Sequence, residues 1–342
     1  MRAIFLERHG SPQQSFSIRE QPIPTPEANE VLIKVSAIGI NYAEVLMRRG
    51  LYPVGKKLPY VPGFEASGTI EKLGPGVAHV KAGQRVVVMV PLGAYSEYIC
   101  TNAANVILIP EKMSFEDAAA MPVNFATAYH CLFNTGVLFP GDRVLIHACA
   151  GGVGLATVQF CKNAGVEIFG TAGSEEKIKF LKEYGVHHPI NYRTEDFSQK
   201  VRELTNGEGI DFVLDSLGGE TLKKSMKLLR ANGRLASIGV SSFTQKNKIQ
   251  LLWELLRRPR LDALSLLRHS TGFYGVYLAR FADRPKLFTS IMQNVLAQYT
   301  QGKIKPYIGK TFPFERVAEA HALLESRGSI GKLLLLITSK LG

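Results

Sequence analysis

One segment, residues 144–155, constrains the fold of this chain more than any other. It sets an apolar strand directly against a glycine-rich turn and the start of a helix, with the letters VLIHACAGGVGL. Gly151 and Gly152 allow a ligand to approach the backbone, and Gly154 allows the helix to pack closely on the strand. The N-terminus of that helix offers free N–H groups and a partial positive charge to an anion. The turn from Gly151 to Gly154, with Val153 inside it, therefore predicts a site for the pyrophosphate of a dinucleotide.

The sequence after the turn supports this prediction, although Cys149 stands where the G-x-G-x-x-G fingerprint has its first glycine. Residues 155–164 read as a helix that ends at Gly165, and residues 166–171 read as a second strand. That order is a βαβ unit, the context in which the fingerprint binds a nucleotide. A tight turn in another α/β protein, without a nucleotide, is the alternative.

The tip of the second strand indicates which dinucleotide is bound. NAD-binding proteins commonly have Asp or Glu about 20 residues after the glycine loop, where it binds the ribose hydroxyls. Here the tip contains Gly173, Ser174 and Lys177, and the two glutamates nearby lie in the first turn of the next helix. We infer that Ser174 and Lys177 hold a 2′-phosphate, and therefore that the cofactor is NADP(H). Ser174 also fits a helix N-cap and Lys177 a surface lysine, and neither role excludes phosphate binding.

The bulk properties of the chain fit a two-domain globular protein. Its 342 residues exceed what one hydrophobic core usually organises. No apolar run is long enough to span a bilayer and no signal peptide is recognised, so we expect a cytoplasmic protein. The four cysteines are far apart, which argues against a disulfide framework or a zinc knuckle. The net charge of +12 is spread along the chain, and we expect no nucleic-acid partner.

The distribution of turns divides the chain into two domains. Residues 1–122 show short strands between glycine and proline turns, the pattern of an irregular antiparallel barrel. Residues 123–303 alternate helices with strands, which predicts a parallel sheet, and the helices are expected to stop at glycines such as Gly185 and Gly233. Residues 304–342 return to short strands and are expected to complete the first domain. The predicted fold class is therefore α/β, with a doubly wound parallel sheet beside a β-barrel.

A leucine-rich segment with several lysines and arginines occupies residues 241–270. Pro259 is expected to divide it into two short amphipathic helices. We favour a helical lid packed over the cleft. A basic amphipathic surface that rests on anionic lipid is the alternative.

Five motifs together resemble the zinc-independent quinone oxidoreductase branch of the medium-chain dehydrogenase/reductase superfamily, over essentially the full chain. They are residues 39–42 (GINY), 50–53 (GLYP), 62–68 (PGFEASG), 147–154 (HACAGGVG) and 215–218 (DSLG). The leucine-rich segment and residues 302–306 look most like the vesicle amine transport protein subgroup. The resemblance implies a GroES-like barrel domain, a Rossmann domain, and a homodimer formed through an edge strand near residues 272–277.

The resemblance also bears on metal binding. Zinc-dependent members of the superfamily hold the catalytic zinc through a cysteine after the Gly-Ile pair and a histidine before the glutamate. Asn41 and Phe64 stand at these two places, and neither is a normal zinc ligand. The separate four-cysteine lobe is also missing from the sequence. We therefore expect no metal.

Similarity to the family adds further residues to the predicted cofactor site. Tyr192 and Arg327 match positions that help to hold the adenosine phosphate. The nicotinamide half matches the following positions: Asn41, Tyr42, Thr127, Ser216, Leu217, Gly239, Val240, Phe273, Tyr274, Gly275 and Val276. Structural roles are the alternatives: Tyr192 as a half-buried aromatic residue, Arg327 as a surface cation and Asn41 as a turn residue.

The resemblance implies hydride transfer from NADPH to a quinone or a conjugated enone, because no metal is available to polarise a carbonyl. Tyr52 is the candidate proton donor by motif position, and water is its competitor. An enoyl-thioester or alkenal double-bond reductase is the alternative within the same class. A non-catalytic, membrane-associated NADPH-binding protein is the alternative from another class, and we do not favour it.

Overall fold

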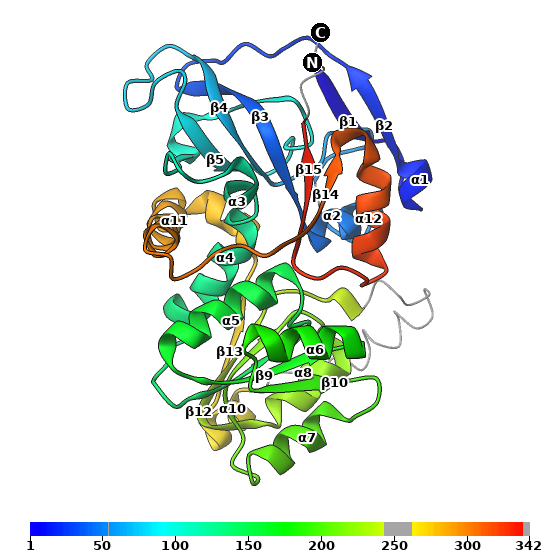
Figure 1. Ribbon diagram of the computed structural model, residues 1–342, viewed down its shortest axis with the longest axis vertical. Coiled ribbons are helices and arrows are strands. Elements are labelled where there is room, and N and C mark those ends of the chain that lie inside the picture. The colour runs from blue at the N-terminus through cyan, green and yellow to red at the C-terminus, as the bar shows by residue number, and fades with distance from the viewer. Residues whose placement is uncertain (54, 243–261, 338–342) are drawn as a thin grey trace. The chain divides into compact units, whose positions relative to one another are not determined.

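The computed structural model describes residues 1–53, 55–242 and 262–337 of the chain. The chain forms two compact units, the first from Met1–Ala126 with Ala279–Gly342 and the second from Thr127–Leu278 (Figure 1). Residues 243–261 of the leucine-rich segment, and with them Pro259 and the first of the two predicted helices, lie outside the described residues, whereas residues 263–269 form a helix. Among the helices of the described part, none is both long enough and apolar enough to cross a membrane.

The second unit is built on a parallel sheet, as the alternation of helices and strands predicted. Within the described residues its strand order is β10-β9-β8-β11-β12-β13, and all neighbours are parallel. The strands are β8 (Arg143–Ile146), β9 (Glu167–Ala172), β10 (His188–Asn191), β11 (Ile210–Asp215), β12 (Leu229–Ser237) and β13 (Gly272–Gly275). The helices are α5 (Gly152–Ala164), α6 (Glu175–Tyr184), α7 (Phe197–Leu204), α8 (Gly219–Met226) and α10 (Ala263–His269). This topology confirms the doubly wound class.

Glycines end two of these helices where the sequence predicts. Gly165 caps α5 with φ 68°, and Gly185 caps α6 with φ 100°, a left-handed conformation that glycine adopts without a Cβ clash. The expected stop at Gly233 is wrong, because α8 ends at Met226 and Gly233 lies inside β12. A Cβ at Gly233 would lie 2.8 Å from the Arg230 carbonyl oxygen and 2.9 Å from that of Ile210, so this glycine serves close backbone approach within the sheet.

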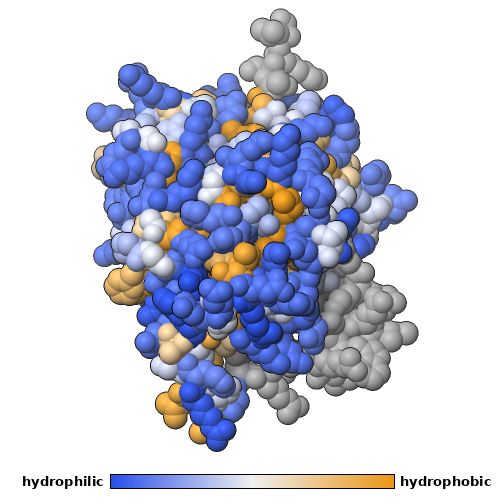
Figure 2. Space-filling view, turned by 60° about the horizontal axis from the view of Figure 1, so that its bottom comes forward, coloured by the Kyte–Doolittle hydropathy of each residue, from blue (hydrophilic) through white to orange (hydrophobic). Residues whose placement is uncertain are grey.

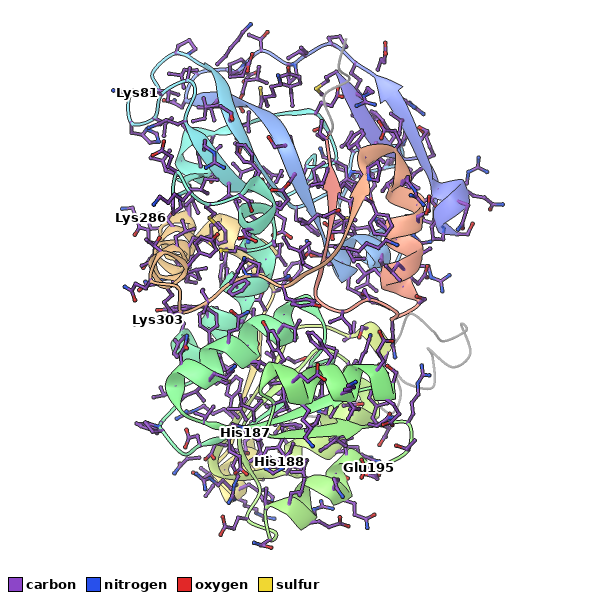
Figure 3. The ribbon with its side chains drawn as sticks, in the orientation of Figure 1. Lys81, His187, His188, Glu195, Lys286 and Lys303 are labelled. Atoms are coloured by element: carbon purple, nitrogen blue, oxygen red, sulfur yellow. The ribbon has the colours of Figure 1, made fainter. Side chains whose placement is uncertain are left out.

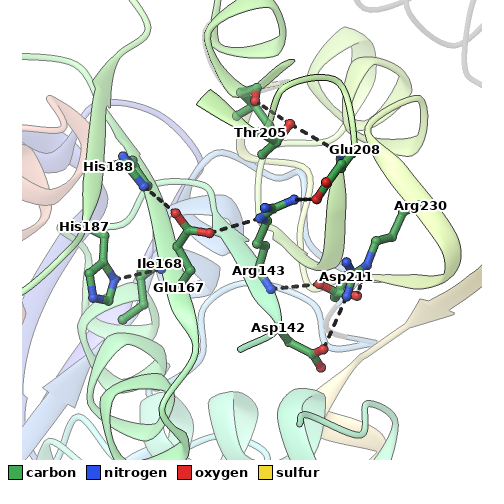
Figure 4. A network of polar contacts seen from close by, with 12 residues as sticks. Asp142, Arg143, Glu167, Ile168, His187, His188, Thr205, Glu208, Asp211 and Arg230 are labelled. Atoms are coloured by element: carbon green, nitrogen blue, oxygen red, sulfur yellow. Dashed lines mark hydrogen bonds and ion pairs between the residues drawn. The ribbon is translucent and has the colours of Figure 1, made fainter. Parts of the chain in front are cut away.

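A polar network joins the strands at their amino ends (Figure 4). Arg143 Nε lies 3.0 Å from Glu167 Oε2, and its Nη1 lies 2.6 Å from Glu208 Oε2. His188 Nε2 lies 2.7 Å from the other oxygen of Glu167, and the Ile168 N–H donates to Nδ1 of the neighbouring His187. Both histidines therefore have structural partners in this part of the sheet (Figure 3).

The first unit contains the β-sheet predicted from the short strands. Within the described residues its order is β14-β15-β3-β4-β5-β7, with β6 also paired to β3, and β1 and β2 form a separate pair. The strands are β1 (Arg2–Leu6), β2 (Phe16–Glu20), β3 (Glu30–Ile40), β4 (Glu65–Leu73), β5 (Arg85–Met89), β6 (Tyr98–Asn102), β7 (Val106–Leu108), β14 (Ile308–Pro313) and β15 (Lys332–Leu336). The C-terminal strand β15 pairs with β3, so the tail contributes a strand to this sheet.

Helices surround this sheet and close its apolar core. They are α1 (Pro12–Ser15), α2 (Tyr42–Arg48), α3 (Phe115–Ala119), α4 (Pro122–Tyr129, which crosses the boundary between the units), α11 (Pro285–Thr300) and α12 (Val317–Glu325). The predicted domain division placed residues 279–303 in the second domain, whereas they belong to the first unit. One reason is α11, where the Tyr299 hydroxyl donates to Asp117 Oδ2 at 2.7 Å and Phe288 and Ile291 are buried.

Candidate functional site

The glycine turn has the geometry that an anion requires. Gly151 is the N-cap of α5, and no side chain bonds to the cap. The Leu155 N–H donates to the Gly151 carbonyl, so the N–H groups of the residues between them have no acceptor within the helix. A Cβ at Gly154 would collide with the Cys149 carbonyl, which confirms that only glycine fits there. The residues present therefore fit a pyrophosphate at this turn.

The residues predicted to hold the 2′-phosphate come together at the carboxyl ends of β9 and β10. Ser174 caps α6 by accepting a hydrogen bond from the Lys177 N–H at 3.3 Å, so its N-cap role is confirmed. A Cβ at Gly173 would lie 2.5 Å from the Tyr192 hydroxyl oxygen, so this hydroxyl lies directly over the Gly173 backbone. The Glu175 carboxylate accepts from Asn191 Nδ2. The tip thus combines two hydroxyls with a lysine, and one oxygen of the Glu175 carboxylate is bonded to Asn191.

The residues predicted for the nicotinamide half lie at the carboxyl ends of β11, β12 and β13. Buried Asp215 accepts hydrogen bonds from the Leu217 and Gly218 N–H groups, and burial raises the pKa of Asp215 to about 6. A Cβ at Gly218 would lie 3.2 Å from Val240 Cγ1, so the segment that follows β11 lies close to the segment that follows β12. The remaining positions at this edge are Ser216, Gly239, Phe273, Tyr274, Gly275 and Val276.

Four predicted residues lie elsewhere in the chain. Thr127 is buried at the first position of the second unit. Asn41 and Tyr42 precede and begin α2, and Arg327 follows α12 with φ 59°, all three in the first unit. A role for these four residues at the cofactor stays a prediction.

Asn41 belongs to a buried ionic cluster that the sequence did not reveal. We define the Lys332 cluster as Asn41, Glu44, Glu65 and Lys332, whose exposed fractions are 7, 1, 0 and 3%. Lys332 Nζ donates to Asn41 Oδ1 at 2.6 Å and also contacts Glu65 Oε1. Asn41 Nδ2 donates to Glu65 Oε1 at 2.8 Å, so both ends of the Asn41 amide are occupied. The only sequence signal for Lys332 is a lone lysine at the start of an apolar run.

The Lys332 cluster contains two carboxyl groups and one ammonium group, so one negative charge lacks a compensating cation. Burial is the largest influence on Glu44 and, together with the charge of Glu65, raises the pKa of Glu44 to about 8, although Lys332 acts in the opposite direction. At neutral pH Glu44 therefore holds a proton. The Asn41 N–H donates to Glu44 Oε2 at 3.0 Å, which completes a capping box at the start of α2.

The predicted proton donor lies among aromatic residues of the first unit. Tyr52 is half-buried, and its ring centroid lies 5.8 Å from that of Phe64, the residue at the place of the zinc-binding histidine. Both pack in one apolar cluster, the Tyr60 cluster, whose buried members are Leu6, Met47, Tyr60 and Phe64. Among the described residues, no three His, Cys, Asp or Glu side chains converge in a group that would hold a metal. The absence of a metal stays a prediction.

Comparisons with known proteins agree with this architecture. Residues 152–292 match the family model of the zinc-binding dehydrogenases, and residues 27–111 match that of the alcohol dehydrogenase GroES-like domain. The human synaptic vesicle membrane protein VAT-1 homolog is 37% identical over 316 residues, which are 91% of this chain and 80% of that protein. The 2-haloacrylate reductase of a Burkholderia species is 34% identical over 341 residues, 98% of each protein.

A solved structure gives the same result. The crystal structure of the Escherichia coli quinone oxidoreductase complexed with NADPH matches 98% of this chain and 100% of that chain. Its TM-score is 0.88 at 32% sequence identity.

The raised pKa of Glu44 predicts how stability depends on pH. Between the ordinary pKa of a glutamate and 8, the folded protein binds a proton that the unfolded chain has released. The contribution of this group is complete below that ordinary pKa and is lost as pH rises through 8. We expect the free energy of unfolding of the wild type to fall by about 2–4 kcal/mol relative to Glu44→Gln between pH 5 and pH 8, measured by urea denaturation. The exposed Glu71→Gln serves as control, and parallel profiles for Glu44→Gln and wild type contradict the assignment.

Proposed function

The chain belongs to the medium-chain dehydrogenase/reductase superfamily, and we propose that it is an NADPH-dependent oxidoreductase that transfers a hydride to a quinone or a conjugated enone without zinc. The observation that carries the proposal is a pair of features at the carboxyl ends of the parallel strands: the N-terminus of α5 and the polar residues after the next two strands. The α5 N-terminus supplies the N–H groups of residues 152–154, which have no acceptor within the helix, for a pyrophosphate. Ser174, Lys177 and Tyr192 lie at the end of the next strands, where the adenosine ribose is expected.

The polar groups at this second feature favour a phosphate over free ribose hydroxyls. A 2′-phosphate needs donors and a cation, which the Ser174 and Tyr192 hydroxyls and the Lys177 ammonium provide. A ribose diol needs an acceptor, whereas the residues directly after β9 are Gly173 and Ser174, and Glu175 Oε1 accepts from Asn191 Nδ2. When NADPH is bound, it supplies the hydride. The residues at the ends of β11, β12 and β13 then bound the nicotinamide, and Asn41, Tyr42, Thr127 and Arg327 extend the proposed site by resemblance.

The proposed reaction does not use a metal. Phe64 and Asn41 occupy the places of two zinc ligands, and the Asn41 amide is bonded to Lys332 and Glu65. The electrophile must therefore be activated by its own conjugation, as in a quinone or an enone. Tyr52 is the proposed proton donor, with water as its competitor. Double-bond reduction of enoyl thioesters or alkenals is the second candidate, and the resemblance to a 2-haloacrylate reductase supports it.

We also propose a homodimer formed through β13 and α10. Beyond β12, β13 has no further strand partner in the described part of the chain, and α10 buries none of its residues. Leu264 and Leu267 on α10 are 62 and 77% exposed. Figure 2 shows one face of the molecule, on which hydrophobic residues also gather near the middle of the view. An open strand edge beside exposed leucines suits pairing with a second copy. A cytoplasmic location, where NADPH is available, stays a prediction. Residues 243–261, which make up most of the segment that motivated the membrane-associated alternative, lie outside the described residues, so no membrane function is proposed.

Reversing the charge at Lys177 tests the cofactor assignment. We expect Lys177→Glu to weaken NADPH binding about 10–100-fold and to leave NADH binding nearly unchanged, because a charge-assisted hydrogen bond to the phosphate contributes about 1.5–3 kcal/mol. Titration calorimetry with each cofactor measures both affinities. Lys179→Glu on the exposed side of α6 is the matched control. Equal losses for NADPH and NADH count against the phosphate site.

A panel of electrophiles tests the reaction. Oxidation of NADPH is followed with 1,4-naphthoquinone, a 2-alkenal and an enoyl thioester, before and after treatment with a chelator. We expect reduction of the quinone at a rate that chelation does not change. Inactivity with every quinone removes the leading proposal, activity confined to the enoyl thioester or alkenal establishes the second candidate, and stoichiometric zinc in the purified protein contradicts metal independence.

Light scattering during size-exclusion chromatography tests the dimer. We expect the wild type to have twice the mass of one chain, and Leu264→Glu with Leu267→Glu to shift it toward the monomer, because two buried carboxylates oppose an apolar interface. Leu204→Glu on α7 is the control, since Leu204 is also exposed but lies away from β13. A wild type that is monomeric at micromolar concentration refutes the proposal.

A further inference from the structure

Two backbone hydrogen bonds with Leu6 hold Tyr60 at the end of β1. The Leu6 N–H donates to the Tyr60 carbonyl at 2.8 Å, and the Tyr60 N–H donates to the Leu6 carbonyl at 3.3 Å. Its side chain is only 6% exposed and belongs to the Tyr60 cluster, together with Met47 and Phe64. The ring therefore has little freedom to move its hydroxyl to solvent.

The hydroxyl of Tyr60 is buried and has no hydrogen-bond partner among the described residues. It is the single polar atom of this side chain, and an unsatisfied buried hydroxyl lowers the stability of a folded protein. Two other tyrosines of the same unit show the usual solution. The hydroxyl of fully buried Tyr95 lies 3.0 Å from His321 Nε2, and that of Tyr299 donates to Asp117 at 2.7 Å.

A phenylalanine would fill the same apolar space as Tyr60 without the unpaired hydroxyl. The cost of this hydroxyl is explained if its partner arrives with a ligand. Its location supports that explanation, because the same cluster contains Tyr52, the proposed proton donor, and Phe64, which stands at the place of a zinc ligand in zinc-dependent relatives. Burial raises the pKa of Tyr60, so at neutral pH the hydroxyl keeps its proton and acts as a donor.

We propose that the Tyr60 hydroxyl donates a hydrogen bond to the carbonyl oxygen of the electrophile. This inference rests on the proposed hydride transfer. It names the residue that would help to polarise the carbonyl, as a metal does in zinc-dependent relatives. The electrophile gains a hydride and its electron pair, the conjugated π bond shifts toward the carbonyl, and the negative charge accumulates on the oxygen next to Tyr60. Tyr60 keeps its own proton, and a proton from Tyr52 or water neutralises the product. A donor already fixed in an apolar cluster stabilises such charge better than water does.

The inference requires a substrate with a carbonyl oxygen near the reacting carbon. Quinones, enones, alkenals and enoyl thioesters all meet this requirement, whereas an alkene activated by a nitro group offers a differently placed acceptor. The donor therefore selects for the carbonyl class as a whole, and the shape of the apolar cluster selects within it.

The variant Tyr60→Phe removes only the oxygen and tests the inference. We expect kcat/KM for 1,4-naphthoquinone to fall about 10–100-fold, the range for one hydrogen bond to developing charge. The dissociation constant for NADPH is expected to stay within about twofold, because Tyr60 belongs to the first unit and the glycine turn to the second. The urea midpoint of unfolding is expected to stay equal or rise, because an unpaired buried hydroxyl has been removed.

Tyr95→Phe is the matched control. It removes a buried hydroxyl that has a partner, so we expect its urea midpoint to fall while kcat/KM stays unchanged. A Tyr60→Phe variant with unchanged kcat/KM overturns the inference, and so does one whose urea midpoint falls as far as that of Tyr95→Phe, since the hydroxyl then has a structural partner. A wild type that reduces no electrophile refutes the proposed function itself, which distinguishes the two failures.

Discussion

The arrangement of the first unit depends on one buried ammonium group, that of Lys332. Lys332 opens β15, and its Nζ contacts Asn41 at the end of β3 and Glu65 at the start of β4. Strand register brings them together, because Leu333 pairs with Ile40 and Gly39 pairs with Glu65. A buried charge without partners costs several kcal/mol, so the sheet and the ion pair must form together. Gly39 is part of this requirement, since a Cβ there would collide with the Glu65 carboxylate.

The same cluster fixes the beginning of two helices. Glu44 and Asn41 form the capping box of α2, and Glu65 Oε2 accepts from the Val123 N–H at 2.7 Å at the start of α4. A carboxylate at a helix N-terminus, such as Glu65 at α4, is favoured by the partial positive charge of the helix, whereas the protonated Glu44 contributes through its hydrogen bond with the Asn41 N–H. In zinc-dependent relatives a divalent cation lies near these positions, whereas here the cation is a side chain of the C-terminal strand. The positive charge in this part of the first unit is therefore supplied by the chain itself.

Local sequence patterns predicted the second unit better than the first. The apolar strands and the capping glycines Gly165 and Gly185 are determined by neighbours in sequence, so periodicity and turn chemistry reveal them. Gly233 shows the limit, because its role depends on the Ile210 and Arg230 carbonyls inside the sheet. The Lys332 cluster joins residues 291 and 267 positions apart, and no local pattern indicates which lysine will be buried. The sequence likewise does not indicate that the Tyr60 hydroxyl is unpaired, because this depends on the residues that surround it in the folded protein.

The amino ends and the carboxyl ends of the strands in the parallel sheet differ in how their polar groups are paired. This difference explains why the proposed site lies at the carboxyl ends. At the amino ends, Arg143 pairs with both Glu167 and Glu208, so these charged groups already have partners within the protein. At the carboxyl ends, the glycine turn leaves N–H groups without acceptors. Polar groups that already have a partner gain little from binding a ligand, whereas unpaired polar groups are stabilised when a ligand bonds to them. The role proposed for the Tyr60 hydroxyl follows the same reasoning in the other unit, because this buried hydroxyl has no partner among the described residues and would gain one from the substrate.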